Sequence, residues 1–214
     1  MGSRKIFDIH THVWPDKIAS DVLKHLQAKS CNLPVYSDGT AGCLRRLALK
    51  AGYSGWMNCP VVTRPDQAHS LNKKAALVNT WPSLSMGGIH PEDPDLVGEL
   101  QHIMDLGLHG IKMHPEYQEF NPLEVRVEPI WSFCESNDFP VIIHAGNDVG
   151  FQPPFHSRPR DFAELIRRHP GLTLICAHCG GWLVWDEVEC DLSGHPVYFD
   201  TSFSADLTIM EEAT

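Results

Sequence analysis

Short apolar segments alternate with stretches of helical length along the chain, and this alternation constrains the fold more than any other feature. The strand candidates are 5–10, 54–62, 84–89, 109–113, 140–144, 172–177 and 196–201. The helical candidates are 16–29, 40–51, 66–79, 94–106, 123–137 and 158–169. Hydrophobic strands separated by helices are typical of a parallel sheet covered by helices, either doubly wound or closed into a (β/α)8 barrel.

Polar residues at the strand ends favour the barrel. A doubly wound sheet gathers its ligand groups at one switch point, whereas a barrel gathers them from every strand at one mouth. No glycine-rich nucleotide fingerprint is present. We therefore expect a single TIM-type barrel domain over residues 1–214. Residues at or just past the ends of strand candidates are His12, His90, His114, His144, His178 and Asp200.

The first strand candidate leads into two histidines, in the sequence IFDIHTH at residues 6–12. Alternate residues of a strand share a face and the rise is about 3.3 Å per residue, so Asp8, His10 and His12 should lie on one face, with the two histidine Cα atoms roughly 7 Å apart. Two imidazoles at that separation can bind one metal ion; a pair of surface histidines is the alternative. Asp8 is expected to orient a ligand by hydrogen bonding.

Composition excludes several classes of partner. Lysine and arginine number 17 against 27 acidic residues, a formal net charge of -10, which disfavours a nucleic-acid partner. No apolar run approaches the roughly 20 residues that span a bilayer, and the first strand begins too early for a signal peptide. We expect a cytoplasmic protein without a membrane partner.

The cysteines point to a reducing compartment. There are 7, scattered without the spacing of a disulfide framework. Cys176 and Cys179 form a C-x-x-C motif around His178, at the end of an apolar run. A redox or zinc pair usually sits in a turn or at a helix start, so these cysteines are expected to be small core residues.

Six motifs follow one another along the chain: DIHTH (8–12), GGIHPE (87–92), GIKMHPEYQEF (110–120), PVIIHAGND (140–148), AHCGGW (177–182) and VYFDTSFS (197–204). Together they resemble the amidohydrolase superfamily, in particular its amidohydrolase-related branch of metal-dependent TIM-barrel hydrolases and decarboxylases. The resemblance runs from the first strand candidate to the last, and the ordered combination is far more specific than any one motif.

The resemblance implies a set of metal ligands. His10 and His12 match the two ligands of the first strand, His144 matches the ligand of the fifth, and His178 matches a sixth-strand histidine that binds a second metal or positions the reacting water. One or two divalent ions are implied. Zn2+ is the default for imidazole-rich sites, and Mn2+, Fe2+ and Co2+ suit the same ligand types.

The family pattern also has an aspartate at the end of an eighth strand, and this sequence lacks both. The sequence ends at Thr214, just inside what reads as the helix after strand seven, so the barrel is expected to be incomplete, with seven strands visible. We expect a fragment; closure of the barrel by another chain and replacement of the missing carboxylate by Asp200 are the alternatives. A seven-strand sheet would have two unpaired edges, which is compatible with homo-oligomer formation.

Further residues are assigned to the substrate, a small molecule that can carry a carboxylate. Lys112 and His114 share a face of their strand, and Lys112 is expected to hold a substrate carboxylate rather than to be carbamylated. His90 and His114 either contact substrate or brace loops. Arg158 is more simply a solvated residue at a helix start than a carboxylate clamp, and Trp182 and Trp185 are expected to pack against the barrel. No chemistry is expected of His25, His69, His102, His109, His169 and His195.

Three functions are consistent with these residues. The first is a metal-dependent hydrolase in which metal-activated water attacks an amide, lactam, lactone or ester carbonyl, with His178 and Asp200 as catalytic residues. The second is non-oxidative decarboxylation of an aromatic or unsaturated acid. The third is an inactive fragment or binding subunit that lacks the last-strand aspartate.

Overall fold

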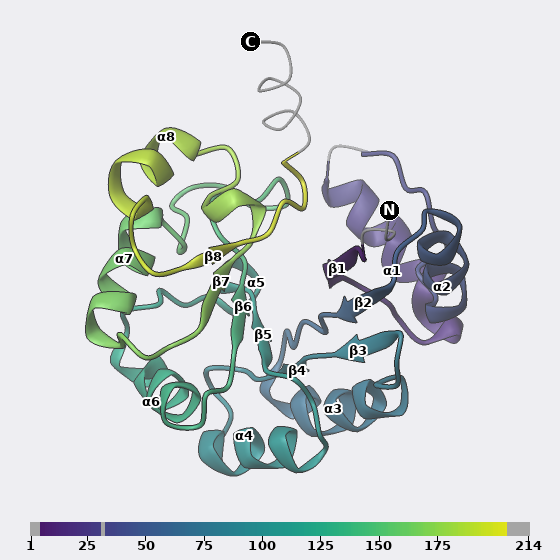
Figure 1. Cartoon of the computed structure of the whole chain (residues 1–214), viewed down its shortest axis with the longest axis horizontal. Coiled ribbons are helices and arrows are strands. Elements are labelled where there is room, and N and C mark those ends of the chain that lie inside the picture. The colour runs from purple at the N-terminus through teal and green to yellow at the C-terminus, as the bar shows by residue number, and fades with distance from the viewer. Residues whose placement is uncertain (1–4, 31–32, 205–214) are drawn as a thin grey trace.

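The computed structural model describes residues 5–30 and 33–204, and its strands form a curved parallel sheet inside a ring of helices (Figure 1). The strands pair in the orders β1-β2-β3 and β4-β5-β6-β7-β8. Their bounds are β1 Phe7–Thr11, β2 Gly55–Asn58, β3 Ser83–Ser85, β4 Gly87–Gly88, β5 Ile111–Met113, β6 Val141–Ile143, β7 Leu174–Cys176 and β8 Tyr198–Phe199.

Backbone hydrogen bonds join the two runs of strands at Met86. The Met86 N–H donates to the Asn58 carbonyl over 2.9 Å, and the next N–H, of Gly87, donates to Gly110 over 2.8 Å. β3 and β4 therefore correspond to the single strand predicted at 84–89, which is interrupted at Met86. With that pair counted once, the seven predicted strand positions are all present, and the TIM-barrel class is confirmed.

Helices cover the outer face of the sheet, as Figure 1 shows. Each predicted helix is found, with 66–79 and 123–137 opening on a short 3-10 turn (η1 Pro65–Gln67, η2 Val125–Val127). The helix expected after the seventh strand falls on residues 205–214, outside the described residues. The helices are α1 Asp16–Lys29, α2 Ala41–Lys50, α3 Ala68–Leu77, α4 Leu96–Asp105, α5 Pro115–Gln118, α6 Glu128–Ser136, α7 Pro159–Arg168 and α8 Trp185–Glu187, with η3 His178–Gly180 and η4 Val188–Leu192.

Capping side chains explain where two of these helices begin. The Thr40 hydroxyl accepts the Cys43 N–H at the start of α2, and the Asp95 carboxylate accepts the Gly98 N–H at the start of α4, both over 3.1 Å. Each bond satisfies an N–H that has no partner within the helix.

Alternation along the strands divides the core into two layers. Ile111 and Met113 of β5 pack in the large cluster between sheet and helices, so Lys112, between them, faces the barrel interior. In β6 and β7 the same alternation places Ile142 and Ile175 inside, in a smaller cluster with Met57, Cys59 and Met86. The barrel interior is thus apolar where this smaller cluster lies and polar at the carboxyl ends of the strands.

The two edge strands meet only through side chains among the described residues. β1 pairs with β2 alone and β8 with β7 alone, but His10 and Asp200 contact each other across the gap between them. Apolar side chains on these edges stay accessible: Phe7 is 39% exposed and Tyr198 is 64% exposed. In the described part of the chain, no helix combines the length and the hydropathy needed to cross a bilayer.

Candidate metal and active site

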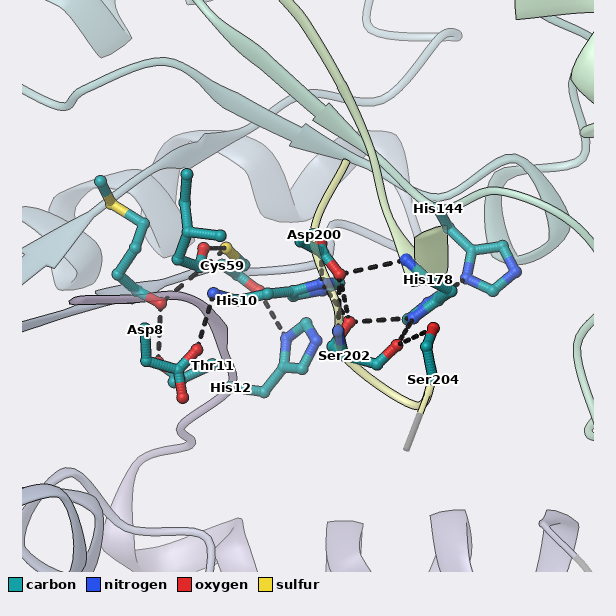
Figure 2. A network of polar contacts seen from close by, with 12 residues as sticks. Asp8, His10, Thr11, His12, Cys59, His144, His178, Asp200, Ser202 and Ser204 are labelled. Atoms are coloured by element: carbon teal, nitrogen blue, oxygen red, sulfur yellow. Dashed lines mark hydrogen bonds and ion pairs between the residues drawn. The ribbon is translucent and has the colours of Figure 1, made fainter. Parts of the chain in front are cut away.

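The carboxyl ends of the strands bring five imidazole rings into one chain of contacts. His12 lies 5.0 Å from His10 between ring centroids, His10 lies 5.5 Å from His178, His178 lies 4.9 Å from His144, and His144 stacks on His114 at 4.1 Å. They come from β1 and from the segments that follow β5, β6 and β7. Figure 2 shows four of these histidines together with Asp200, which follows β8.

Asp200 and Ser202 connect the two ends of the sheet (Figure 2). The His10 Nδ1 atom lies 2.8 Å from Asp200 Oδ2, and the His178 backbone N–H donates to Asp200 Oδ1 over 3.0 Å. The Ser202 hydroxyl lies 3.1 Å from His10 Nδ1 and 2.9 Å from His178 Nδ1. One ligand atom from each of His10, His178 and Asp200 falls within 4.8 Å of the others, as the ligands of one ion must.

The hydrogen bonds assign a tautomer to each of the four central histidines, because an oxygen without a proton can only accept. His10 donates its Nδ1 proton to Asp200, His12 donates Nδ1 to the Cys59 carbonyl (2.7 Å), and His178 donates Nδ1 to the Ser202 carbonyl (3.0 Å). His144 donates its other nitrogen, Nε2, to the Asn147 carbonyl (3.1 Å). Each ring is left with one unprotonated nitrogen.

Two of these unprotonated nitrogens face each other. His144 Nδ1 lies 3.1 Å from His178 Nε2. Two lone pairs at that distance repel unless a proton or a metal ion lies between or beside them, and ligands of a tetrahedral ion with bonds of about 2.1 Å stand roughly 3.4 Å apart. The donor set and its spacing fit a divalent metal ion.

His114 differs from the other four because both of its nitrogens are engaged. Its Nδ1 accepts the Tyr117 N–H over 3.5 Å, and its Nε2 lies 3.4 Å from Asp148 Oδ2. One ligand atom each from His114, His144 and Asp148 also fall within 4.8 Å. In this tautomer the Nε2–H of His114 faces Asp148 and Nδ1 accepts from Tyr117, so His114 offers no free lone pair to a metal ion.

Burial and one lysine keep the imidazoles neutral. Burial lowers the pKa of His10 and, more strongly, those of His12, His114 and His144, and the charge of Lys112 lowers each of them further. The same causes lower the pKa of His178 to about 4. Burial opposes ionisation of Asp200, but the hydrogen bonds that its carboxylate accepts from His10, Ser202 and the His178 backbone N–H outweigh it and hold that pKa well below its usual range. Neutral imidazoles beside an ionised carboxylate are the protonation states that metal binding requires.

Lys112 itself is the least satisfied group of the site. Its side chain is 1% exposed, and Nζ has no hydrogen-bond partner among the described residues. Burial lowers the pKa of Lys112 to about 8, although the charge of Asp200 opposes the shift. A buried amine in this position is suited to a ligand carboxylate.

The family model described as Amidohydrolase matches residues 7–211. This chain belongs to the amidohydrolase family. Comparison with curated proteins gives no significant match. Three solved structures share the fold of this chain at low sequence identity. This similarity establishes the barrel fold but does not identify the substrate.

An uncharacterised TIM-barrel protein from Bordetella bronchiseptica is 15% identical with a TM-score of 0.74, over 98% of this chain and 81% of that one. 5-Carboxyvanillate decarboxylase from Sphingomonas paucimobilis is 14% identical with a TM-score of 0.62, over 97% and 84%. A dihydroxybenzoic acid decarboxylase from a Polaromonas species, solved with manganese and 2-nitroresorcinol, is 15% identical with a TM-score of 0.62, over 98% and 82%.

Backbone strain in this amidohydrolase helps to aim His178. His178 and Cys179 follow β7 with φ of 60° and 54°, the left-handed region that non-glycine residues rarely adopt. The Trp185 Nε1–H donates to the His178 carbonyl over 3.1 Å and holds this turn. Strained residues persist where the surroundings over-determine them, often at functional sites. Cys176, before the turn, is fully buried, as expected of a core residue, whereas Cys179 is only half-buried, so the prediction of a core position is wrong for Cys179.

The remaining predicted residues lie at the edge of the site or take structural roles. His90 is buried, its Nδ1 accepts the Glu92 N–H over 3.2 Å, and the charges acting on it are those of Glu92, Arg126 and Asp93. Asp8 accepts the backbone N–H of His10 over 3.1 Å. Its carboxylate therefore supports the backbone of β1, and among the described residues it makes no hydrogen bond to the imidazole ring that it was expected to orient. Arg158 pairs with Glu187, and its contact with Asn147 Oδ1 is 3.4 Å.

Three functional residues were not assigned from the sequence. Ser202 and Asp148 lie in the quoted motifs VYFDTSFS and PVIIHAGND, but only the structure shows that they contact His10 and His114. Gln118 is 3% exposed and connects three strand ends: it donates to the Val62 and Ile89 carbonyls and accepts the His114 N–H. A polar residue shortly after a strand-end histidine was the available signal.

Proposed function

We propose that this amidohydrolase is a metal-dependent hydrolase that binds its ion with His10, His12, His144 and His178. One observation carries the proposal: each of these imidazoles gives one nitrogen to a carboxylate or carbonyl oxygen and keeps the other unprotonated. Such partners fix the tautomer and orientation of a ligand histidine and raise its basicity. The rings of these four histidines follow one another in contact, and ligand atoms of His10 and His178 lie within 4.8 Å of each other.

A divalent ion, with Zn2+ as the first choice, would supply an acidified water and a Lewis acid for a carbonyl oxygen. Asp200 orients His10 and, being ionised, is the available proton acceptor. His178 acts through the ion, which it would hold with Nε2 while its Nδ1–H donates to the Ser202 carbonyl. Lys112 binds the substrate, and His114, whose ring stacks on that of His144, is proposed as a further substrate contact. The expected substrates carry an amide, lactam, lactone or ester, with a carboxylate to pair with Lys112.

Decarboxylation is the second candidate, because the buried amine of Lys112 is placed to bind a carboxylate among the histidines. Two solved structures of the same fold are decarboxylases, one of them holding manganese. In this reaction the carboxylate leaves as carbon dioxide, and water contributes no oxygen to the organic product. His90, in the loop after β4, is proposed as a more distant substrate contact.

Metal analysis tests the proposed ligands directly. The chelated protein is loaded with Zn2+ or Mn2+, and metal per chain is compared for the wild type, His10→Ala and His144→Ala, with exposed His195→Ala as the matched control. Loss of bound metal in both site variants supports the ligand set. Metal content equal to that of the control in both variants would refute it.

Turnover then separates the three functions. A panel of esters, lactones and amides and a panel of aromatic and unsaturated acids are assayed with each metal in 18O-labelled water. Label in the organic product identifies hydrolysis, and carbon dioxide release with no label in the organic product identifies decarboxylation. Metal binding without turnover of either panel would favour the binding-subunit alternative.

A further inference from the structure

A second group of metal-type ligands lies outside the barrel mouth, between the neighbouring helices α3 and α4 (Figure 1). His69 stands in the first turn of α3, and Glu99 and His102 lie one turn apart on α4. One ligand atom from each of the three falls within 4.8 Å of the others. No chemistry is predicted for these histidines from the sequence, because both fall in helical candidates and not at strand ends.

The carboxylate of this group is held firmly. Asn72, which is fully buried, donates its Nδ2 to Glu99 Oε1 over 2.7 Å and to the Gly88 carbonyl over 2.9 Å. The Gly88 N–H returns a bond of 2.8 Å to Asn72 Oδ1, so the carboxylate is tied through Asn72 to β4. The second oxygen, Oε2, is left to face His69 Nδ1 at 3.1 Å.

The third member has an unexplained buried atom. The ring of His102 stacks on that of His69, with centroids 4.3 Å apart and planes 23° from parallel. His102 Nε2 is inaccessible to solvent and has no hydrogen-bond partner in the described part of the chain. Buried polar atoms in native proteins are almost always satisfied, so an orphaned imidazole nitrogen beside a fixed carboxylate indicates a missing ligand.

The surroundings are acidic and open. A hollow of about 390 Å³ borders the group, lined by His69, Glu99, Pro65, Asp66, Pro94 and Asp93. Asp66 is paired with Arg64, whereas the Asp93 carboxylate accepts the backbone N–H of Asp95. Solvent can therefore supply further ligands, and the nearby carboxylates attract a cation.

We propose that His69, Glu99 and His102 form a second divalent-metal site, structural in character and independent of the mouth. Two imidazoles and a carboxylate suit Zn2+, Co2+ or Ni2+, with water from the hollow in the remaining position. The His69–Glu99 separation is already close to the roughly 3.4 Å between ligands of a tetrahedral ion. The ion would join α3 to α4 and, through Asn72, to β4.

The test measures zinc per chain after chelation and equilibrium dialysis against Zn2+. The variants are His69→Ala, Glu99→Gln and His102→Ala, and the controls are His25→Ala and His195→Ala, which remove exposed histidines elsewhere. Each site variant is expected to bind about one zinc fewer than the wild type, or to bind that ion at least tenfold more weakly, since even the loss of a group that only orients a ligand costs about 10- to 100-fold. The controls should match the wild type.

Two further arms keep the result decisive. Because the His69 side chain is 58% exposed and glutamine can still accept from Asn72, His69→Ala and Glu99→Gln should fold even if His102→Ala does not, as circular dichroism will show. The double variant His10→Ala/His144→Ala should retain the outer ion, which separates this proposal from the one for the mouth. Equal zinc content and affinity in the wild type, His69→Ala and Glu99→Gln would overturn it.

Discussion

Replacing Gln118 by leucine should destabilise the mouth of the barrel without touching a proposed metal ligand. Three hydrogen bonds disappear: two from the amide nitrogen to the Val62 and Ile89 carbonyls, of 2.8 and 2.6 Å, and one of 2.8 Å from the His114 N–H to the amide oxygen. At about 1 kcal/mol each, their loss costs roughly 3 kcal/mol. All three partners belong to buried residues, so the penalty for leaving them unsatisfied raises the cost to about 3–4 kcal/mol.

Thermal unfolding followed by circular dichroism measures this effect. For a chain of this size about 1 kcal/mol corresponds to 2–4 °C, so Gln118→Leu should melt roughly 6–15 °C below the wild type. The matched control is Gln101→Leu on the exposed face of α4, whose amide bonds Asp105, and it should stay within about 0.5 kcal/mol. Gln118→Glu keeps the shape and the acceptor for His114 but loses both donated bonds, so it should also be destabilised. A Gln118→Leu protein that melts within about 2 °C of the wild type would show that the three bonds do not hold the strand ends together.

Four further outcomes are expected. Asp200→Asn should weaken metal binding at the mouth by about 10- to 100-fold in equilibrium dialysis, because it removes the ionised acceptor for His10 Nδ1; unchanged affinity would contradict the assigned tautomer. Trp131→Phe should cost about 2 kcal/mol in urea unfolding, since it deletes the 2.8 Å bond to the Pro122 carbonyl and leaves a small cavity; a loss below about 0.5 kcal/mol would count against that bond. Peptide mapping after alkylation at pH 8 should find exposed Cys190 modified and Cys59 and Cys134 protected, because burial raises the pKa of both thiols to about 12; early labelling of either would mean that the core opens. Tyr198→Lys should reduce light scattering at high protein concentration with little change in melting temperature, because a charge on an edge strand discourages pairing with another sheet; scattering equal to the wild type would place the association elsewhere.

The strands and the cluster of strand-end histidines could be predicted, because both follow from local sequence patterns. Apolar runs mark the strands, and the carboxyl ends of parallel strands meet at one edge, so the positions of His10, His144 and His178 along the chain were enough to expect them near one another. The interruption at Met86 could not be predicted, because it depends on which neighbouring strand each N–H faces, and no local pattern specifies that choice.

The partners that decide the chemistry were beyond sequence reasoning for a different reason. Ser202 and Asp148 are ordinary loop residues until the fold brings them against an imidazole, and Gln118 is an ordinary polar residue at the end of α5 until its amide meets the strand ends. The pair of His69 and His102 lies on two helices, and only the packing of α3 on α4 brings their rings together. The i,i+3 spacing of Glu99 and His102 on one helix was the signal that could have been read.

The contact between His10 and Asp200 has a consequence for the whole chain. His10 lies on one edge strand, β1, and Asp200 directly follows the other, β8. An ion bound by His10 and its neighbours would therefore cross-link the beginning and the end of the described polypeptide. Metal binding at the mouth of the barrel would therefore stabilise the folded state, and the melting temperature should rise with the free metal concentration.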